Sequence, residues 1–230
     1  MAGVDVEGSY PIRFELRPDE RYAALPQPRD DLRLLFPRHL TVMAAALSEE
    51  AYLPDLLMWS FAQRSYALVD GFLGAFDTWD LLVAAPLVRL QIDTLVRLSY
   101  AATCSDMDAL TTALLDGVEF RAMKDEAGRR LLDGCLVERA QKLHPWLKPV
   151  YDTACGWVHF SPLHLFLGTQ ASDGKLSGHL PLHPDILPER LLSEVLGAML
   201  QATQNLVDYL SRWATHNEEL AESHGQIAED

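Results

Sequence analysis

Three charged side chains recur at every fourth position of an otherwise mostly apolar segment: Arg89, Asp93 and Arg97. This spacing places them on one face of a helix, as a ladder in which neighbouring side chains can form ion pairs. The apolar residues around them predict a helix that is buried on most sides. Buried charges need partners, and two guanidiniums with one carboxylate leave a positive charge unmatched. The ladder therefore requires either a second carboxylate from elsewhere in the fold or an anionic ligand.

The two requirements correspond to different roles for the ladder. A second carboxylate would make it a structural ion-pair network, whereas an anionic ligand would make it an internal polar pocket. His159 and Ser161 are candidate members of such a pocket, because they follow directly on an expected helix. They do not form a catalytic pair, since side chains two positions apart diverge and no G-x-S-x-G turn precedes Ser161. Serine hydrolase chemistry is therefore disfavoured.

Five of the eight histidines lie between residues 144 and 183. Four of them are candidate zinc ligands, because imidazole nitrogens suit this ion and two side chains four residues apart can share a helix face. Gly178 and Pro181 interrupt one such pair, so structural or surface histidines are the default interpretation and no cofactor is expected. A metal-dependent hydrolase is the outside alternative. Its candidate ligands are His159, His164, His179 and His183.

The charge of the chain restricts its partners. The net charge is -14 at pH 7, so the surface as a whole repels DNA, and anionic membranes as well. Residues 119–148 are the exception, because cations outnumber anions there, and an anionic ligand or RNA would bind at this segment. No run approaches the roughly 18 apolar residues of a membrane-spanning helix. These features predict a cytoplasmic protein that does not enter the membrane, with its three cysteines reduced and in the core.

The residue pattern divides the chain into an arm, a helical domain and a tail. Residues 1–38 are rich in proline and charge and predict an irregular arm on the surface. Residues 39–220 carry helical periodicity and form the domain. Within it, short apolar runs on either side of Ala-Ser-Asp-Gly predict a β-hairpin insert at about 163–183. Residues 221–230 form an acidic tail.

Capping and breaking residues set the expected helix limits. Thr41 and Asp80 are candidate N-caps, Pro54 suits a first helical turn, and Pro86 predicts a kink or a fresh start. Gly128 is expected to end a helix. The expected helices cover residues 42–50, 56–76, 80–103, 107–115, 118–127, 129–143, 146–158 and 189–220.

The ladder helix, followed later by a helix that ends in Gly-Trp-Val-His-Phe-Ser, resembles the bacterial HEPN-like helical proteins, including the abortive-infection AbiV type. The resemblance covers about 56–166. It implies an all-α bundle, often dimeric, in phage-defence and toxin-antitoxin contexts. It also implies a possible catalytic motif, because several members are metal-independent endoribonucleases in which four to six residues separate an arginine from a histidine. Two such pairs occur here, Arg139 with His144 and Arg33 with His39, which is no more than chance predicts.

We therefore expect an all-α, HEPN-like helical bundle that acts as a non-catalytic or regulatory binding protein. The ladder would line its internal polar pocket, and the wide apolar face of the last helix would join two copies as a homodimer. The alternative is a HEPN-type endoribonuclease that uses Arg139 and His144. Acidic net charge and the chance-level motif both count against RNA cleavage.

Overall fold

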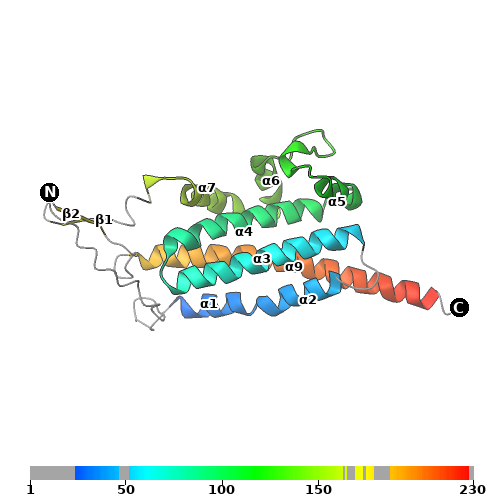
Figure 1. Cartoon of the computed structure of the whole chain (residues 1–230), viewed down its shortest axis with the longest axis horizontal. Helices are drawn as coiled ribbons and strands as arrows, with labels where there is room; N and C mark the ends of the chain where they lie inside the picture. The colour runs from blue at the N-terminus through cyan, green and yellow to red at the C-terminus, as the bar shows by residue number, and fades with distance from the viewer. Residues whose placement is uncertain are drawn as a thin grey trace.

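The computed structural model describes residues 24–46, 52–162, 164, 169–172, 175–178 and 187–227. Four helices run side by side along the molecule and form its main body (Figure 1). They are α2 (Phe36–Ala46), α3 (Leu53–Asp77), α4 (Leu81–Ala101) and α9 (Glu189–Ile227). A short helix, α1 (Pro26–Arg33), precedes α2 and packs on α9. The all-α class expected from the sequence is confirmed for this main body.

A second layer covers one side of α4 (Figure 1). It comprises α5 (Met107–Leu115), a short 3-10 helix η2 (Phe120–Ala122), α6 (Asp133–Ala140) and α7 (Leu147–Val158). Helix α4 packs against α3 and α9 on one side and against α6 and α7 on the other. This central position makes α4 buried on most sides, as its apolar sequence predicts.

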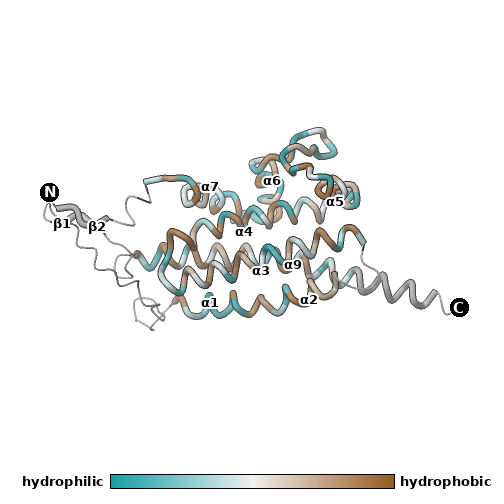
Figure 2. The backbone as a smooth tube through the Cα atoms, in the orientation of Figure 1, coloured by the Kyte–Doolittle hydropathy of each residue, from teal (hydrophilic) through white to brown (hydrophobic). Residues whose placement is uncertain are grey.

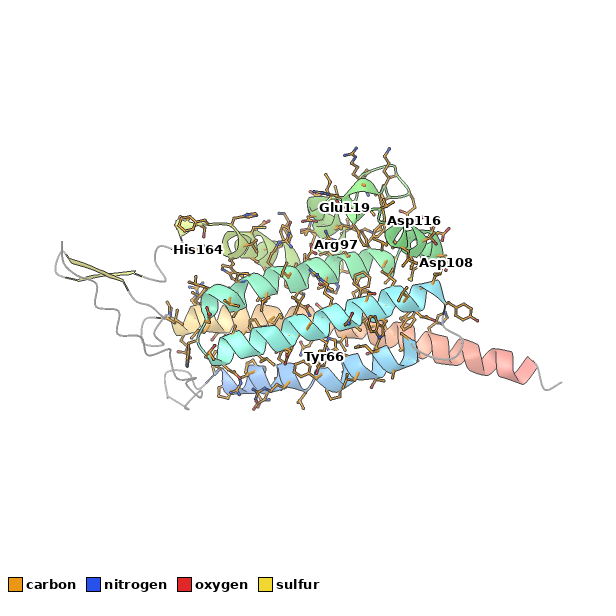
Figure 3. The ribbon with its side chains drawn as sticks, viewed as in Figure 1. Tyr66, Arg97, Asp108, Asp116, Glu119 and His164 are labelled. Atoms are coloured by element: carbon orange, nitrogen blue, oxygen red, sulfur yellow. The ribbon has the colours of Figure 1, made fainter. Side chains whose placement is uncertain are left out.

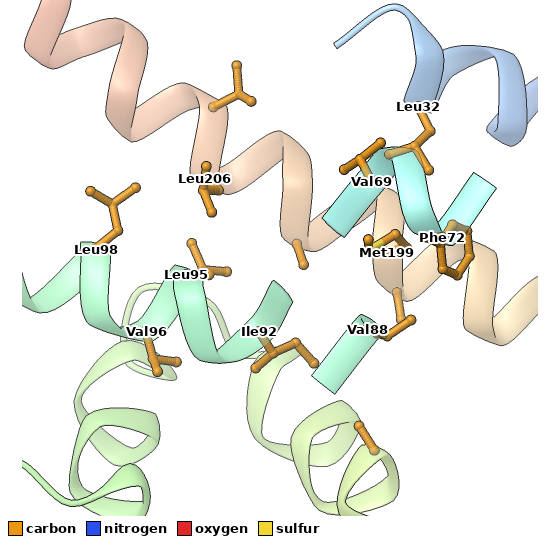
Figure 4. Close-up of a cluster of buried hydrophobic side chains, with 14 of the residues drawn as sticks. Leu32, Val69, Phe72, Val88, Ile92, Leu95, Val96, Leu98, Met199 and Leu206 are labelled. Carbon is orange, nitrogen blue, oxygen red and sulfur yellow. The ribbon is translucent and has the colours of Figure 1, made fainter. Parts of the chain in front are cut away.

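The main core fills the space between α3, α4 and α9. Hydrophobic residues alternate with hydrophilic ones along each of these helices (Figure 2). Phe72, Ile92 and Leu206 are fully buried there, and Figure 4 shows the cluster that they form with their neighbours. Burial of a side chain of this size contributes about 1.5 to 3 kcal/mol each. Among the described residues, no helix combines the length and the apolar character needed to cross a membrane.

The start of α4 explains why Pro86 does not divide it. Asp80 is the N-cap, and its carboxylate accepts a hydrogen bond from the backbone N–H of Val83 (3.2 Å). The expected fresh start at Pro86 is wrong, because one helix runs through this residue. A proline removes one helical hydrogen bond, which here is the bond to the carbonyl of Leu82. Leu82 is a partly exposed residue. The buried residues on both sides of Pro86 hold the helix together.

The described part of the expected irregular arm is helical. Prolines open both α1 and α2, where they cost nothing because the first N–H groups of a helix have no internal partner. Thr41 lies inside α2 and donates to the carbonyl of Pro37 (3.1 Å), so its prediction as an N-cap is wrong. Residues 1–23 lie outside the described residues.

Two expected helices are shorter than the sequence pattern suggests. The segment 118–127 forms η2 and then a turn in which Lys124 pairs with Arg130 as an isolated bridge. Asp125 accepts the backbone N–H of Arg129 (2.8 Å), and Gly128 adopts a φ of 76°. These local contacts compete with the helix. The next helix is therefore limited to α6, rather than 129–143.

Two short strands follow α7. β1 (Thr169–Ser172) pairs antiparallel with β2 (Lys175–Gly178), with Thr169 opposite Gly178. Most other residues of the expected insert at 163–183 lie outside the described part of the chain. Helix α9 continues to Ile227, so it extends into the expected acidic tail.

Candidate functional site

The ladder of α4 is completed by a carboxylate from α6. Arg89 Nη1 lies 3.5 Å from Asp93 Oδ1, and Arg97 Nη1 also contacts this oxygen. On the other side, Asp133 lies 3.2 Å from Arg89 Nη2 and 2.7 Å from Arg97 Nη2. The four side chains therefore close a ring of ion pairs, which we call the ion-pair ring. Of the two expected alternatives, a second carboxylate or an anionic ligand, the structure shows a carboxylate from outside the helix.

The ion-pair ring is largely shielded from water on the α4 side. The exposed fractions of the side chains of Arg89, Asp93 and Arg97 are 12%, 19% and 21%, whereas that of Asp133 is 42%. A further cation, Arg64 of α3, has Nη2 4.0 Å from Asp93 Oδ2. Charges at this depth interact more strongly than exposed pairs do. The ring therefore joins α3, α4 and α6 electrostatically.

Aromatic side chains cover both guanidiniums of the ring. Arg89 lies 4.1 Å from the centre of the Tyr151 ring and donates to the Tyr151 hydroxyl (2.8 Å). Arg97 lies 5.6 Å from the centre of the Phe120 ring. Burial lowers the pKa of Arg89, but its contacts with Cys155, Tyr151 and Asp93 outweigh this and raise it. The ring therefore also attaches α7 and η2 to α4.

A cavity of about 360 Å³ lies one turn further along α4, next to the ion-pair ring. Phe120 connects the two, since its ring packs edge-on against Tyr100 with 6.4 Å between centroids. We call this cavity the α5 pocket. In Figure 3, Arg97 lies beneath the segment that carries Glu119, and Asp108 marks the adjoining α5. The pocket is lined by Tyr100, Cys104, Ser105, Asp106, Ala109, Leu110, Ala113, Met123, Lys124, Asp125, Glu126 and Leu131.

The lining of the α5 pocket is apolar at its base and charged at its edge. Tyr100, Leu110 and Leu131 are buried, with exposed fractions of 6%, 7% and 4%. Exposed charged residues, among them Asp106 and Lys124, lie at the edge. This combination of an apolar cavity with a few polar groups is typical of small-molecule sites, as is the volume.

Hydrogen bonds of the acidic residues shape the pocket wall. Asp106 caps α5 by accepting from the N–H of Ala109 (2.8 Å). Glu126 accepts from the N–H of Ser105 (3.4 Å) and lies 3.7 Å from Arg139 Nη1. These contacts tie the 123–131 loop to the α4–α5 connection. The 123–131 part of the lining lies between Phe120 and Asp133, which both contact the ion-pair ring.

His159 and Ser161 are placed away from the ladder. His159 is exposed directly after α7. The Ser161 hydroxyl donates to the carbonyl of Gly156 (2.7 Å), and its N–H donates to Nδ1 of His164 (3.1 Å). Figure 3 shows His164 at the end of the second layer, distant from Arg97. Within the described residues, neither candidate contacts the ion-pair ring.

The clustered histidines do not form a metal site in the described part of the chain. No group of three His, Cys, Asp or Glu side chains is arranged there to hold a metal ion. The ring of His164 stacks on Phe160 instead, with 5.5 Å between centroids. His179 and His183 lie outside the described residues. The three cysteines are unpaired; Cys104 and Cys155 are partly buried and Cys135 is exposed, so the expectation that all three lie in the core is wrong.

Arg139 and His144 bind to different elements. Arg139 donates to the hydroxyl of Thr103 (3.2 Å) and lies over the ring of Tyr100. His144 Nε2 lies 3.2 Å from the hydroxyl of Tyr209, on α9. Burial, and to a lesser extent Arg212, lowers the pKa of His144. Helix α6 ends at Ala140, so His144 is not held on the same helix as Arg139.

The sequence analysis missed a neutral network on the opposite face of α4. His39 Nδ1 lies 2.9 Å from the carbonyl of Leu35, so this nitrogen carries the proton and Nε2 accepts from Ser65 (2.9 Å). Gln91 donates to Ser65 (2.6 Å) and to Thr203 (3.0 Å). We call these four side chains the core network; they come from α2, α3, α4 and α9, and none is exposed. His39 appeared in the sequence only as part of a chance-level motif.

Comparison with models of known protein families, with curated proteins and with solved structures finds no match for this chain.

Proposed function

We propose that this chain is a non-catalytic or regulatory binding protein whose ligand site is the α5 pocket. The observation that carries the proposal is the cavity itself: about 360 Å³, with a buried apolar base and charged residues at its edge. In this proposal the ion-pair ring positions the site and does not itself bind the ligand. Its two guanidiniums already have two carboxylates, so no anion is required there.

The location of the cavity supports this role. Most of its walls belong to the second layer and to the segment that joins this layer to α4; Tyr100 of α4 also lines it, whereas the described residues of α3 and α9 contribute no part of the lining. A ligand at the edge of α4 can therefore bind without rearranging α3 and α9. Binding sites commonly use such loop and short-helix segments on a rigid scaffold.

A methyl NMR titration with a neutral apolar probe, phenylpropanol, tests the proposal. We expect shifts at Leu110, Met123 and Leu131, which line the pocket, and none at methyl groups of the main core. Ala109→Trp should abolish these shifts by filling the entrance. Thr112→Trp is the matched control, because Thr112 is exposed on α5 and does not line the pocket. Shifts that spread over the surface, or that survive Ala109→Trp, would contradict the proposal.

The HEPN-like class is part of the proposal and rests on the sequence resemblance over 56–166. With it come a hairpin insert after α7, a homodimer formed through α9 and a setting in bacterial phage defence or toxin-antitoxin systems. The alternative activity, metal-independent RNA cleavage, would require Arg139 and His144 to face one accessible cleft.

We predict no ribonuclease activity above that of an Arg139→Ala, His144→Ala double variant. Arg139 is hydrogen bonded to Thr103, just after α4, and His144 to Tyr209 of α9, and burial lowers the pKa of His144. A gel assay with cellular RNA, in the presence of a chelator, measures this directly. Cleavage by the parent protein that the double variant lacks would replace the binding proposal with the ribonuclease.

A further inference from the structure

We infer that the α5 pocket selects a small organic amine, that is, an apolar body that carries one ammonium group. This inference rests on the proposed function, because it names the ligand class of the same cavity. Three features of the lining carry it: the apolar base, the carboxylates at the edge and the hydroxyl of Tyr100.

The base of the pocket requires an apolar ligand body. Leu110 and Leu131 are nearly fully buried, and Met123, which also lines the pocket, is half-buried. An adaptable methionine at such a position accommodates ligands of different outline. The volume accepts a molecule of the size of a phenylalkyl chain.

The edge of the pocket favours a positive charge. Three acidic residues line it, against one lysine. Asp125 is matched by Arg129 at 2.7 Å, whereas Asp106 forms no ion pair within the described part of the chain. Glu126 forms an ion pair with Arg139 (3.7 Å), so Asp106 is the carboxylate of the edge that a ligand cation can match. The net charge of -14 adds a long-range attraction for cations.

Tyr100 supplies a polar group that faces the cavity. Its side chain is nine-tenths buried, and among the described residues its hydroxyl has no hydrogen-bond partner. Burial and the neighbouring Glu126 raise the pKa of Tyr100, so the hydroxyl stays protonated at neutral pH. The oxygen of this hydroxyl is available as an acceptor in the pocket lining, and an ammonium group of a bound ligand can donate to it.

Three matched probes test the charge preference: phenylpropylamine, phenylpropanol and phenylpropionate. Each is titrated into the full chain and followed at the methyl signals of Leu110, Met123 and Leu131. We expect the amine to bind about tenfold more tightly than the alcohol, and the carboxylate to bind most weakly. Raised salt should reduce the difference, since the charges at the edge are exposed.

Three variants sharpen the test, and the first two have opposite effects. Asp106→Asn removes a charge but keeps the helix cap, because asparagine caps as well as aspartate does, so the amine should weaken severalfold and the alcohol should not change. Lys124→Gln removes the one cation at the edge and should strengthen amine binding. Tyr100→Phe should weaken the amine more than the alcohol, and an unchanged thermal midpoint shows that this variant is folded.

The outcomes separate this inference from the proposed function. If the amine and the alcohol bind equally in the pocket, or if the carboxylate binds most tightly, the amine inference is overturned while the binding site remains. If none of the three probes shifts the pocket methyl groups, the binding site is overturned and the amine inference falls with it.

Discussion

Both faces of α4 carry polar side chains that need partners, and the two faces satisfy them in different ways. Gln91 and Asp93 are two positions apart, which places them about 200° apart around the helix. Gln91 faces the main core, where no member of the core network is exposed and all four side chains are uncharged in their stable form. Asp93 faces the second layer, where the ion-pair ring remains in partial contact with water. Charged side chains therefore occupy the face that water still reaches, whereas the fully buried face has only neutral hydrogen bonds.

The difference also separates two tasks. The core network joins four helices that form the main body, α2, α3, α4 and α9. The ion-pair ring attaches the second layer, through Asp133 of α6 and the aromatic rings of Tyr151 and Phe120. Loss of the first should weaken the main body, and loss of the second should loosen the segment that forms the α5 pocket.

The largest effect is expected from breaking the ring at its centre. Asp93→Ala leaves Arg64, Arg89 and Arg97 with one carboxylate fewer, and should destabilise the fold by about 3 kcal/mol. Urea denaturation measures this. Asp152→Ala, which breaks an exposed ion pair with Lys148 on α7, is the matched control and should cost less than about 1 kcal/mol. Equal midpoints for Asp93→Ala and the parent would mean that the ring contributes nothing.

A smaller loss is expected when the core network is cut. Ser65 both donates to His39 and accepts from Gln91, so Ser65→Ala leaves two buried groups without this partner. The expected cost is about 2 kcal/mol in the same urea experiment. Unlike the cost of Asp93→Ala, it should not change between low and high salt, because no charge is involved. A strong salt dependence would show that the two faces do not differ as described.

The sequence predicted the ladder better than it predicted the core network. Arg89, Asp93 and Arg97 belong to one helix, and their spacing alone shows that they need another carboxylate. The identity of that carboxylate depends on how α6 docks, so Asp133 could not be named from the sequence. His39 was hidden because Pro37, read as part of an irregular arm, lies in the first turn of α2. The residues of a network between helices are far apart in the sequence, so no local spacing pattern reveals them.

The α5 pocket could not be anticipated for a similar reason. Its lining comes from four segments, and the expected helix at 118–127 is a turn instead. The sequence pointed instead to His159 and Ser161, at the end of α7. Ser161 forms its hydrogen bonds there with nearby residues, Gly156 and His164. Short-range spacing therefore identified local contacts and missed the cavity.

Acid should weaken the core network, because His39 must take up a proton that its buried position disfavours. Burial lowers the pKa of His39 below its ordinary value of 6.5, and Arg38 lowers it further, despite the bond to Leu35. The unfolded chain then binds the proton first, so this stability is complete above about pH 6.5 and is lost as the pH falls.

The pH dependence can be assigned by comparing variants. Each buried histidine contributes a slope of at most about 1.4 kcal/mol per pH unit. His144 contributes as well, since burial also lowers its pKa. We expect His39→Gln and His144→Gln each to reduce the slope of unfolding free energy between about pH 6.5 and pH 5. An unchanged slope in His39→Gln would show that this histidine binds its proton equally in the folded and unfolded states, which would contradict a lowered pKa.

The smallest effect is expected at Gln91, although it lies at the centre of the molecule. Its Oε1 is buried without a hydrogen-bond partner within the described residues, so the side chain already carries an unfavourable group. Gln91→Met removes this atom, keeps the volume and leaves the Ser65 and Thr203 hydroxyls donating to their other partners. We expect a change in unfolding free energy of less than about 1 kcal/mol. A loss larger than that of Ser65→Ala would contradict this ranking.

Hydrogen exchange of Asp133→Ala tests the central claim most directly, namely that the ion-pair ring holds the pocket-forming segment and the core network holds the main body. This variant removes the carboxylate supplied by α6 and leaves Asp93 between Arg89 and Arg97 on α4. Asp152→Ala is the control, as another aspartate of the second layer that forms an ion pair. We predict faster exchange confined to residues 119–140, with α3 and α9 protected as in the parent and no change in the control. Uniformly faster exchange throughout the bundle, or unchanged exchange at 119–140, would contradict the account.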